Sequence, residues 1–283
     1  MSRRRRNVSV PRPFLKWVGG KGQLLDPLLR LVERAGEFGR YHEPFAGGAA
    51  LFFELYRIGG LGRKHAYLSD TNERLIDAFL AVQQNVDRVI NRLKAHRALH
   101  SKDHYYAVRG EVPDGLIERG ARIIYLNRTC YNGLFRENSK GLFNVPFGRY
   151  ENPLICDEEN LRAASMALTH AKVEVRPFGS VLEEVERGDL VYFDPPYDPL
   201  SRTASFTAYE KTGFGRDKQQ ELAAVAKALT DMGVKVILSN SMTPFICKLY
   251  ADHFMIDEVL ARRHVNSRAD RRGAVSEVLI RNF

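Results

Sequence analysis

An acid, two prolines and an aromatic ring stand together in the stretch DLVYFDPPYDPLS, residues 189–201. The apolar run at its start predicts a buried strand that ends at Asp194. Pro195 and Pro196 have a fixed φ and no N–H, so they hold carbonyl acceptors rigidly beside that carboxylate, and Tyr197 follows with a flat ring face. Two acceptors and a stacking surface suit an exocyclic amine on a purine, because holding its hydrogens directs the nitrogen lone pair at an electrophile. The alternative is a proline-rich turn without chemistry, which would leave an unpaired acid at a buried strand end.

A glycine-rich turn nearer the N-terminus predicts a nucleoside-containing ligand. Residues 41–45 fit a short strand, residues 50–58 have helical apolar spacing, and residues 65–70 fit a second strand. Gly47, between the first strand and the helix, lets the backbone approach a ligand, and Asp70 ends the second strand, where an acid binds a ribose hydroxyl pair. The spacing is neither G-x-G-x-x-G nor a P-loop, so dinucleotide and ATP binding are not favoured. A turn that only packs a helix on a sheet is the alternative.

The stretch FLKWVGGKGQLL, residues 14–25, contains the only tryptophan of the chain, Trp17, between Lys16 and Lys21. An aromatic ring and lysines beside paired glycines suit a ligand site. The alternative is an N-terminal segment that packs its tryptophan into the core, where this residue type is usually found.

The elements that must position these residues predict an α/β protein. The strand, glycine turn, helix and strand of residues 41–70 form a βαβ unit, which implies a parallel sheet. Residues 72–127 have helical patterns, and residues 128–153 are dense in Gly, Asn, Pro and aromatics, which indicates a hairpin with loops. We therefore expect one α/β domain made from both ends of the chain, with a helical and hairpin insert. The pattern predicts further strands at 172–176, 189–193 and 234–240, a helix at 217–231, and antiparallel strands at 255–260 and 275–281.

Composition and charge bound the class of protein. The 283 residues carry 43 basic and 34 acidic side chains and a net charge of +9, which favours a polyanionic partner such as nucleic acid or an anionic membrane. No apolar run approaches the roughly 18 residues of a membrane span, and no secretory signal is recognisable. Three scattered cysteines, Cys130, Cys156 and Cys247, fit a reduced intracellular protein with neither a disulfide framework nor a zinc pattern.

Taken together, these motifs resemble the Dam-like DNA adenine-N6 methyltransferases, the D12 class within the α group of amino-methyltransferases. The DPPY sequence at 194–197 matches their catalytic motif, FLKWVGGK their N-terminal cofactor motif, and LSDTN their ribose-binding acid. The sequence EPFAGGAALFF resembles their Phe-x-Gly-x-Gly motif, although the order here is Gly-Gly-Ala. LNRTCYNGLFREN followed by FNVPFGRY resembles their recognition hairpin. The similarity covers most of the chain in the order cofactor, recognition, catalysis, which is the α-group arrangement.

The resemblance implies a Rossmann-like S-adenosylmethionine-dependent sheet with an inserted target-recognition domain of helices and a β-hairpin. Residues 1–72 and 158–283 would form the catalytic, cofactor-binding domain, and residues 73–157 the DNA-recognition domain. The methyl acceptor would be N6 of an adenine flipped out of double-stranded DNA, with S-adenosylmethionine as the donor and no metal. The implied cofactor-binding residues are Trp17, Lys21, Phe45, Gly47, Asp70 and Asp194. The implied catalytic residues are Asp194, Pro195, Pro196 and Tyr197, the acid and the Pro195 carbonyl on N6 and the tyrosine stacked on the base.

The side chains of the hairpin suit base reading. Arg136 has the fork for guanine O6 and N7, Asn132 can pair with a base edge, and Leu134 suits a thymine methyl. Tyr131 is placed to fill the stack that the target base leaves. Because the matching asparagine, leucine and arginine serve GATC recognition in the Dam family, the resemblance implies GATC; a solvated, charged loop is the alternative. The residues expected to contact DNA are Lys16, Arg128, Tyr131, Asn132, Leu134, Arg136, Arg149 and Tyr150.

Other functions stay open at this point. The alternatives among enzymes are N6 methylation of another short site and N4 methylation of cytosine, where a serine more often replaces the acid. An alternative from another class is a sequence-specific DNA-binding protein that has lost catalysis. A solitary regulator, a phage enzyme and the modification partner of a restriction endonuclease fit the sequence equally. We expect a cytoplasmic monomer, either associated with a prokaryotic nucleoid or encoded by a phage, without a membrane partner.

Overall fold

The chain, seen in a computed structural model, divides into two compact units. The described residues are 10–17, 24–138, 140–200, 214–262 and 274–283. The first unit comprises Met1–Gly20, Gly47–Arg63 and Asn72–Val175, and the second comprises Lys21–Ala46, Lys64–Thr71 and Arg176–Phe283. The predicted division into a catalytic domain (1–72 and 158–283) and a recognition domain (73–157) concerns function, and it stays a prediction.

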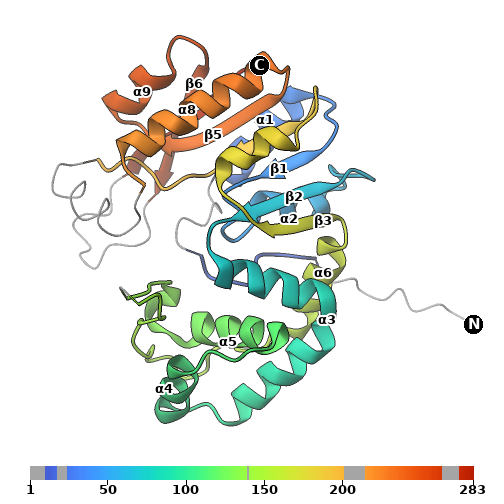
Figure 1. Cartoon of the computed structure of the whole chain (residues 1–283), viewed down its shortest axis with the longest axis vertical. Coiled ribbons are helices and arrows are strands. Elements are labelled where there is room, and N and C mark those ends of the chain that lie inside the picture. The colour runs from blue at the N-terminus through green and yellow to red at the C-terminus, as the bar shows by residue number, and fades with distance from the viewer. Residues whose placement is uncertain (1–9, 18–23, 139, 201–213, 263–273) are drawn as a thin grey trace, which may run out of the picture. The chain divides into compact units, whose positions relative to one another are not determined.

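A mixed sheet of seven strands runs through the described part of the chain, in the order β3-β2-β1-β4-β5-β7-β6 (Figure 1). Strand β1 is parallel to β2 and β4, β4 is parallel to β5, and β7 is antiparallel to β5 and β6. The order 3-2-1-4-5 is that of a doubly wound Rossmann-type sheet. The predicted α/β class, its parallel strands and its antiparallel closing strands are confirmed. The strands are β1 (Tyr41–Glu43), β2 (Ala66–Asp70), β3 (Ala171–Val175), β4 (Leu190–Phe193), β5 (Lys235–Ser241), β6 (Met255–Arg262) and β7 (Ala274–Arg281).

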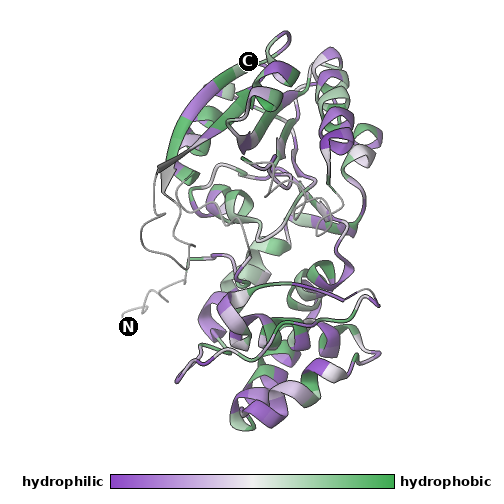
Figure 2. Ribbon diagram, turned by 90° about the vertical axis from the view of Figure 1, so that its left-hand side faces the viewer, coloured by the Kyte–Doolittle hydropathy of each residue, from purple (hydrophilic) through white to green (hydrophobic). Residues whose placement is uncertain are grey.

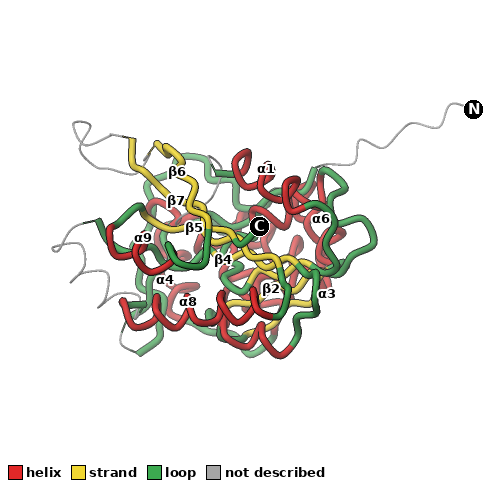
Figure 3. The backbone as a smooth tube through the Cα atoms, turned by 90° about the horizontal axis from the view of Figure 1, so that it is seen from above, coloured by secondary structure: helices red, strands yellow, loops and turns green. Residues whose placement is uncertain are grey.

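The core of the second unit is built around β4 and β5. All four residues of β4 and six of the seven residues of β5 are buried. Continuous burial of this kind is typical of parallel strands covered on both faces. Helices α1 (Leu25–Ala35) and α8 (Arg216–Asp231) lie on opposite sides of the strands, red against yellow in Figure 3. Leu222 of α8 packs into the same core as Val236 of β5, and α9 (Pro244–Tyr250) follows that strand.

The first unit consists mainly of helices that pack along their apolar faces. Asn72 caps the start of α3 (Glu73–Ala98), because its side-chain oxygen accepts the N–H of Arg74 at 3.1 Å. Helix α5 approaches α3 closely at Gly120, where a Cβ would lie 2.3 Å from Ala81 Cβ. Figure 2 shows hydrophilic and hydrophobic residues interspersed along these helices. The helical prediction for residues 72–127 is confirmed, whereas the sequence patterns did not predict α1, α6 or α9. The helices of this unit are α2 (Ala50–Arg57), α3 (Glu73–Ala98), α4 (Lys102–Gly110), α5 (Leu116–Thr129) and α6 (Glu158–Leu168).

The segment 128–153 turns back on itself, as the predicted hairpin requires. Single antiparallel bridges pair Cys130 with Phe147 and Glu137 with Phe143. Among the described residues, no longer run of paired backbone joins the two arms of the hairpin. Side-chain contacts therefore contribute much of its stability. Within the hairpin, residues Tyr131–Gly133 form the short 3-10 helix η1. A second 3-10 helix, η2 (Phe178–Glu183), belongs to the second unit.

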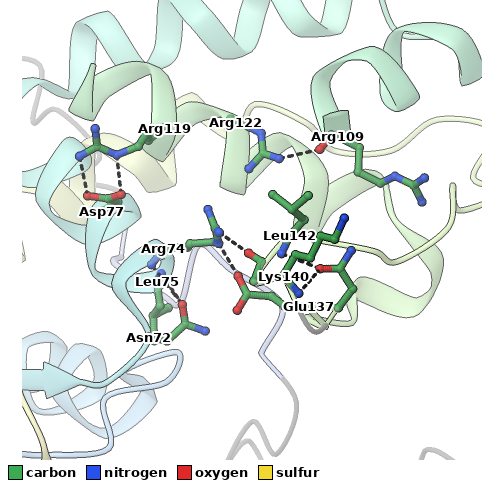
Figure 4. Close-up of polar contacts among 12 residues, drawn as sticks. Asn72, Arg74, Leu75, Asp77, Arg109, Arg119, Arg122, Glu137, Lys140 and Leu142 are labelled. Atoms are coloured by element: carbon green, nitrogen blue, oxygen red, sulfur yellow. Dashed lines mark hydrogen bonds and ion pairs between the residues drawn. The ribbon is translucent and has the colours of Figure 1, made fainter. Parts of the chain in front are cut away.

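Arg74, in the first turn of α3, holds the far part of the hairpin. Its guanidinium donates to the Glu137 carboxylate and to the Gly141 carbonyl (Figure 4). The Asn138 side-chain oxygen accepts the N–H of Leu142 at 3.0 Å and closes the tip. A helix therefore anchors the hairpin near its tip.

Candidate functional site

Three of the predicted site residues follow strands whose carboxyl ends meet at one edge of the sheet. Because β1 pairs in parallel with both β2 and β4, these three strands end on the same side. Phe45 follows β1, Asp70 ends β2, and Asp194 follows β4. In open α/β sheets this edge is where ligands bind. The arrangement therefore fits a site in which the acids of two strands face one ligand.

The Asp194 carboxylate is held by a buried serine on the neighbouring strand. Ser239 of β5 is fully buried, and its hydroxyl donates to Asp194 Oδ1 at 2.8 Å. The same hydroxyl lies 3.2 Å from the hydroxyl of Tyr192. Since Ser239 fixes one carboxylate oxygen, Asp194 has a defined orientation at the sheet edge.

Pro196 and Asp198, which follow the acid, are bonded by buried amide side chains. Gln219 of α8 donates from Nε2 to the Pro196 carbonyl at 2.8 Å, and Asn240 Nδ2 donates to Gln219 Oε1 at 3.1 Å. Asn240 Oδ1 accepts the N–H of Asp198 at 2.9 Å, and the hydroxyl of Thr243 donates to the Asp198 carboxylate at 2.6 Å. Gln219 and Asn240 are both at most 1% exposed. The turn is therefore fixed from the strand and the helix that flank it.

Tyr197 is fixed by an acid of β7. Its hydroxyl donates to Glu277 Oε2 at 3.0 Å. Burial, together with the negative charges of Asp194 and Glu277, raises the pKa of Tyr197 well above its usual value. The phenol thus stays neutral and keeps its proton for the bond to Glu277.

Phe45 lies in an aromatic cluster of the second unit. Its ring stacks on Phe178 at 5.3 Å and meets Phe193 and Phe214 edge-on at 6.2 and 5.6 Å. Phe45 is only partly buried in this cluster. The ring is thus supported from several sides, and its predicted contact with the cofactor stays a prediction.

In the first unit, Trp17 covers Gly47. The glycine has φ +47°, and a Cβ on it would lie 2.9 Å from Trp17 Cδ1. Both its backbone conformation and this close approach require glycine. The indole also packs against Phe135 of the hairpin, with ring centres 5.3 Å apart. Lys21, the remaining predicted cofactor residue, lies outside the described residues.

The predicted base-reading residues are mostly exposed. Tyr131, Asn132 and Arg136 are exposed, and Leu134 is partly buried. Asn132 has φ +53°, a left-handed conformation that asparagine tolerates better than most residues. The Arg136 guanidinium has a hydrogen-bond partner within the hairpin, because its Nε donates to Asn144 Oδ1 at 2.7 Å.

The predicted phosphate-contacting residues differ in their surroundings. Lys16 lies with Nζ 4.7 Å from the ring centre of Tyr150, and Arg149 is exposed. Arg128 instead donates from Nε and Nη2 to the Phe14 carbonyl at 3.1 and 2.9 Å, and burial lowers its pKa. Arg128 therefore has a structural contact, and its contact with DNA stays a prediction.

The residues that fix this site were missed by motif reasoning. Ser239 and Asn240 left one signal, a polar pair at the end of the apolar run VKVILSN. Gln219 and Glu277 left none, because each is an ordinary polar residue within an amphipathic pattern.

The described residues show neither a candidate metal site nor a candidate membrane span. No group of three or more His, Cys, Asp or Glu side chains is arranged there to hold a metal ion. Within the same ranges, no helix has the length and apolar character that crossing a membrane requires.

Comparison with known proteins defines the class. The family model of the D12 class N6 adenine-specific DNA methyltransferases matches residues 17–265. The chain belongs to this family, so the predicted family and enzyme class are confirmed. It is an adenine-specific DNA methyltransferase, its substrate is DNA, and the family implies S-adenosylmethionine as the methyl donor.

Three relatives are similar over nearly the whole chain. A type II methyltransferase from Methanocaldococcus jannaschii is 41% identical over 96% of this chain and 99% of its own length. A type II methyltransferase from Lactococcus lactis subsp. cremoris is 39% identical over 96% and 95%. The DNA adenine methylase of Escherichia coli (strain K12) is 34% identical over 95% and 94%.

Proposed function

We propose that this enzyme transfers a methyl group from S-adenosylmethionine to N6 of an adenine flipped out of double-stranded DNA, within the sequence GATC. The observation that supports the chemistry is the fixed turn Asp194–Tyr197. Its acid is held by Ser239 and its second proline carbonyl by Gln219, at 2.8 Å each. Bonds from buried side chains preorganise a turn for a reaction that depends on alignment.

The residues of the sheet edge fit the methyl donor. Asp70 at the end of β2 suits the ribose hydroxyls, and Phe45 offers a supported ring edge. Gly47 keeps a left-handed turn without a side chain, and Trp17 covers it. Lys21 completes the proposed cofactor-binding set, to which Asp194 also contributes. When bound, the sulfonium supplies an electrophilic methyl carbon.

The turn would orient the adenine amino group. The Asp194 carboxylate and the Pro195 carbonyl accept its two hydrogens, which favours a tetrahedral nitrogen whose lone pair faces the methyl carbon. The new N–C bond forms as the S–C bond breaks, and the proton left on the cationic nitrogen passes to water. Pro196 would restrict the backbone through its fixed φ, and Tyr197 would stack on the base. Stacking offsets part of the few kcal/mol that flipping costs.

Site recognition is assigned to the hairpin. Arg136 would read a guanine, Asn132 an adenine edge and Leu134 a thymine methyl, while Tyr131 fills the vacated stack. The matching hairpin of Dam-like enzymes and a relative named DNA adenine methylase, 34% identical, support GATC. The residues assigned to phosphates or neighbouring bases are Lys16, Arg128, Arg149 and Tyr150.

The proposal includes a division of labour and a partner. Residues 1–72 and 158–283 would bind the donor and catalyse, and residues 73–157 would read DNA. Relatives named type II methyltransferases favour pairing with a restriction endonuclease. The enzyme would act as a monomer in the prokaryotic cytoplasm. Size-exclusion chromatography with light scattering tests the monomeric state.

Incubation with radiolabelled S-adenosylmethionine tests the function. Duplexes that differ only by a GATC or a scrambled site are compared, and digestion to nucleosides identifies the methylated base. We expect label only in N6-methyladenine and only with GATC. Equal labelling of both duplexes would exclude GATC specificity and favour another short site, and label in N4-methylcytosine would exclude adenine. DNA binding without transfer to any duplex would favour a protein that has lost catalysis.

A further inference from the structure

Within the first unit, a single buried amide ties the proposed cofactor segment to the base of the hairpin. Asn127 of α5 is 2% exposed. Its Oδ1 accepts the N–H of Lys16 at 2.7 Å, and its Nδ2 donates to the carbonyls of Lys16 at 2.8 Å and Gly133 at 3.2 Å. Gly133 also allows close contact, since a Cβ there would lie 2.8 Å from Lys16 Cβ. Residues far apart in the sequence are thereby fixed to one another.

An aromatic contact continues this connection to the reading side chains. Trp17 packs against Phe135 with ring centres 5.3 Å apart and a tilt of 33°. Phe135 stands between Leu134 and Arg136, both proposed to read bases. Phe135 also meets the ring of buried Phe143 edge-on at 5.7 Å. Within the first unit, the indole thus links Gly47 to the hairpin.

We propose that Phe135 is a positioning residue that couples donor binding to recognition of the DNA site, with Asn127 as the fixed base of the connection. Trp17 and Gly47 border the donor, and Phe135 transmits the placement of the indole to the backbone between the two reading residues. The inference rests on the proposed function, because it takes the hairpin as the reading element.

The coupling must act in both directions. If the donor makes Trp17 favour the position in which Phe135 aligns the hairpin, a cognate site that fixes the hairpin raises donor affinity by the same factor. A non-cognate duplex does not fix the hairpin and leaves donor affinity unchanged. The enzyme would therefore hold its donor most tightly where its site is present.

The test compares Phe135→Leu with Phe147→Leu. Both changes replace a hairpin phenylalanine by leucine, but of the two only Phe135 packs against Trp17, whereas Phe147 packs against His100 and Tyr105. Calorimetry measures the affinity for S-adenosylhomocysteine, the demethylated product of the donor, without DNA, with a GATC duplex and with a scrambled duplex. We expect GATC to tighten binding by about tenfold in the wild type and in Phe147→Leu. In Phe135→Leu the ratio should fall to about twofold or less. A wild-type ratio of one, or an unchanged ratio in Phe135→Leu, would overturn the proposal.

A second measurement needs no variant. Trp17 is the only tryptophan in the chain, so its fluorescence reports one site. We expect its emission to change when a GATC duplex binds without donor, and not when the scrambled duplex binds. Anisotropy of a labelled strand confirms that each duplex is bound. Unchanged emission with bound GATC duplex would contradict the proposed contact.

Failure of this inference is distinguishable from failure of the proposed function. Methyl transfer to both duplexes is measured first on the wild type. Equal transfer would remove the GATC assignment, and the coupling ratio would then be measured with whichever site is methylated. Selective transfer with an unchanged ratio in Phe135→Leu would remove the coupling alone.

Discussion

The turn Asp194–Tyr197 and the hairpin 128–153 are held in opposite ways. The turn is bonded by side chains that are almost completely buried, among them Ser239 and Gln219. The hairpin has single antiparallel bridges, and its proposed reading residue Arg136 is exposed and bonded to Asn144. One region is fixed by the core of its unit, and the other by contacts at its base and near its tip.

The difference follows from what each region is proposed to do. Methyl transfer needs the amino nitrogen within a narrow range of distances and angles, and a misplacement of about 1 Å reduces the rate by about 10²-fold. Reading a DNA site needs side chains that leave their resting partners and bond to bases. A buried frame suits the first task, and an exposed polar surface suits the second.

The largest expected effect concerns the acid of the turn. Asp194→Ala removes a proposed acceptor for the amino group, and we expect single-turnover methyl transfer to fall by at least about 10³-fold. Binding of the GATC duplex, measured by anisotropy, should change little because the hairpin is untouched. Near-normal turnover would contradict the proposed role of Asp194 and the assignment of chemistry to the turn.

Gln219→Leu tests whether the buried frame matters for the rate. The change leaves the Pro196 carbonyl without its amide partner, which destabilises by about 1–3 kcal/mol and loosens the turn. We expect kcat to fall by about 10- to 100-fold with little change in KM for DNA. Gln220→Leu is the matched control, because the side chain of Gln220 follows Gln219 in the sequence but is exposed. Equal effects of both changes would show that the bond to Pro196 is not what sets the rate.

Two arginines of the hairpin separate base reading from phosphate binding. Arg136→Ala should lose about 1–3 kcal/mol of discrimination at one base pair, since a bidentate guanine contact is removed. Arg149→Ala should weaken binding to all sequences and lower the salt slope by about one. The measurement is methyl transfer and binding on duplexes with single substitutions. Unchanged selectivity in Arg136→Ala would exclude it from the reading set.

The smallest expected effect is a loss of stability in acid, from the histidines of the helical unit. Burial first, and then the charges of His104 and Arg92, lower the pKa of His96 to about 4. The unfolded chain keeps a histidine pKa of about 6.5, so it binds more protons between these values. The free energy of unfolding should therefore be at its full value above about pH 6.5 and decrease towards pH 4.

Urea unfolding at pH 7 and pH 5 measures how much the free energy of unfolding decreases in acid. His96→Gln should make this decrease smaller, whereas His65→Gln, at an exposed position, should leave it unchanged. An identical pH dependence in the wild type and His96→Gln would rule out His96 as its source.

The sequence by itself determined the local chemistry and much of the fold. The apolar run before Asp194 predicted the buried strand that ends there, and proline geometry predicted the rigid carbonyls beside the acid, because both act over a few neighbouring residues. Periodicity predicted the strands and the long helices, and consecutive motifs identified the family. Helices α1, α6 and α9 escaped, although α2, which is shorter than α1 and α6, was predicted from its apolar spacing.

Only the tertiary structure decided which distant residues fix the site. Ser239 meets Asp194 because β4 and β5 are neighbours in register, and Glu277 meets Tyr197 from β7. Phe135 meets Trp17 because Asn127 fixes the base of the hairpin to the N-terminal segment. These partners depend on strand order and helix packing, which link residues across more than forty positions. No local pattern encodes such pairs, so the chemistry was readable from the sequence and its supports were not.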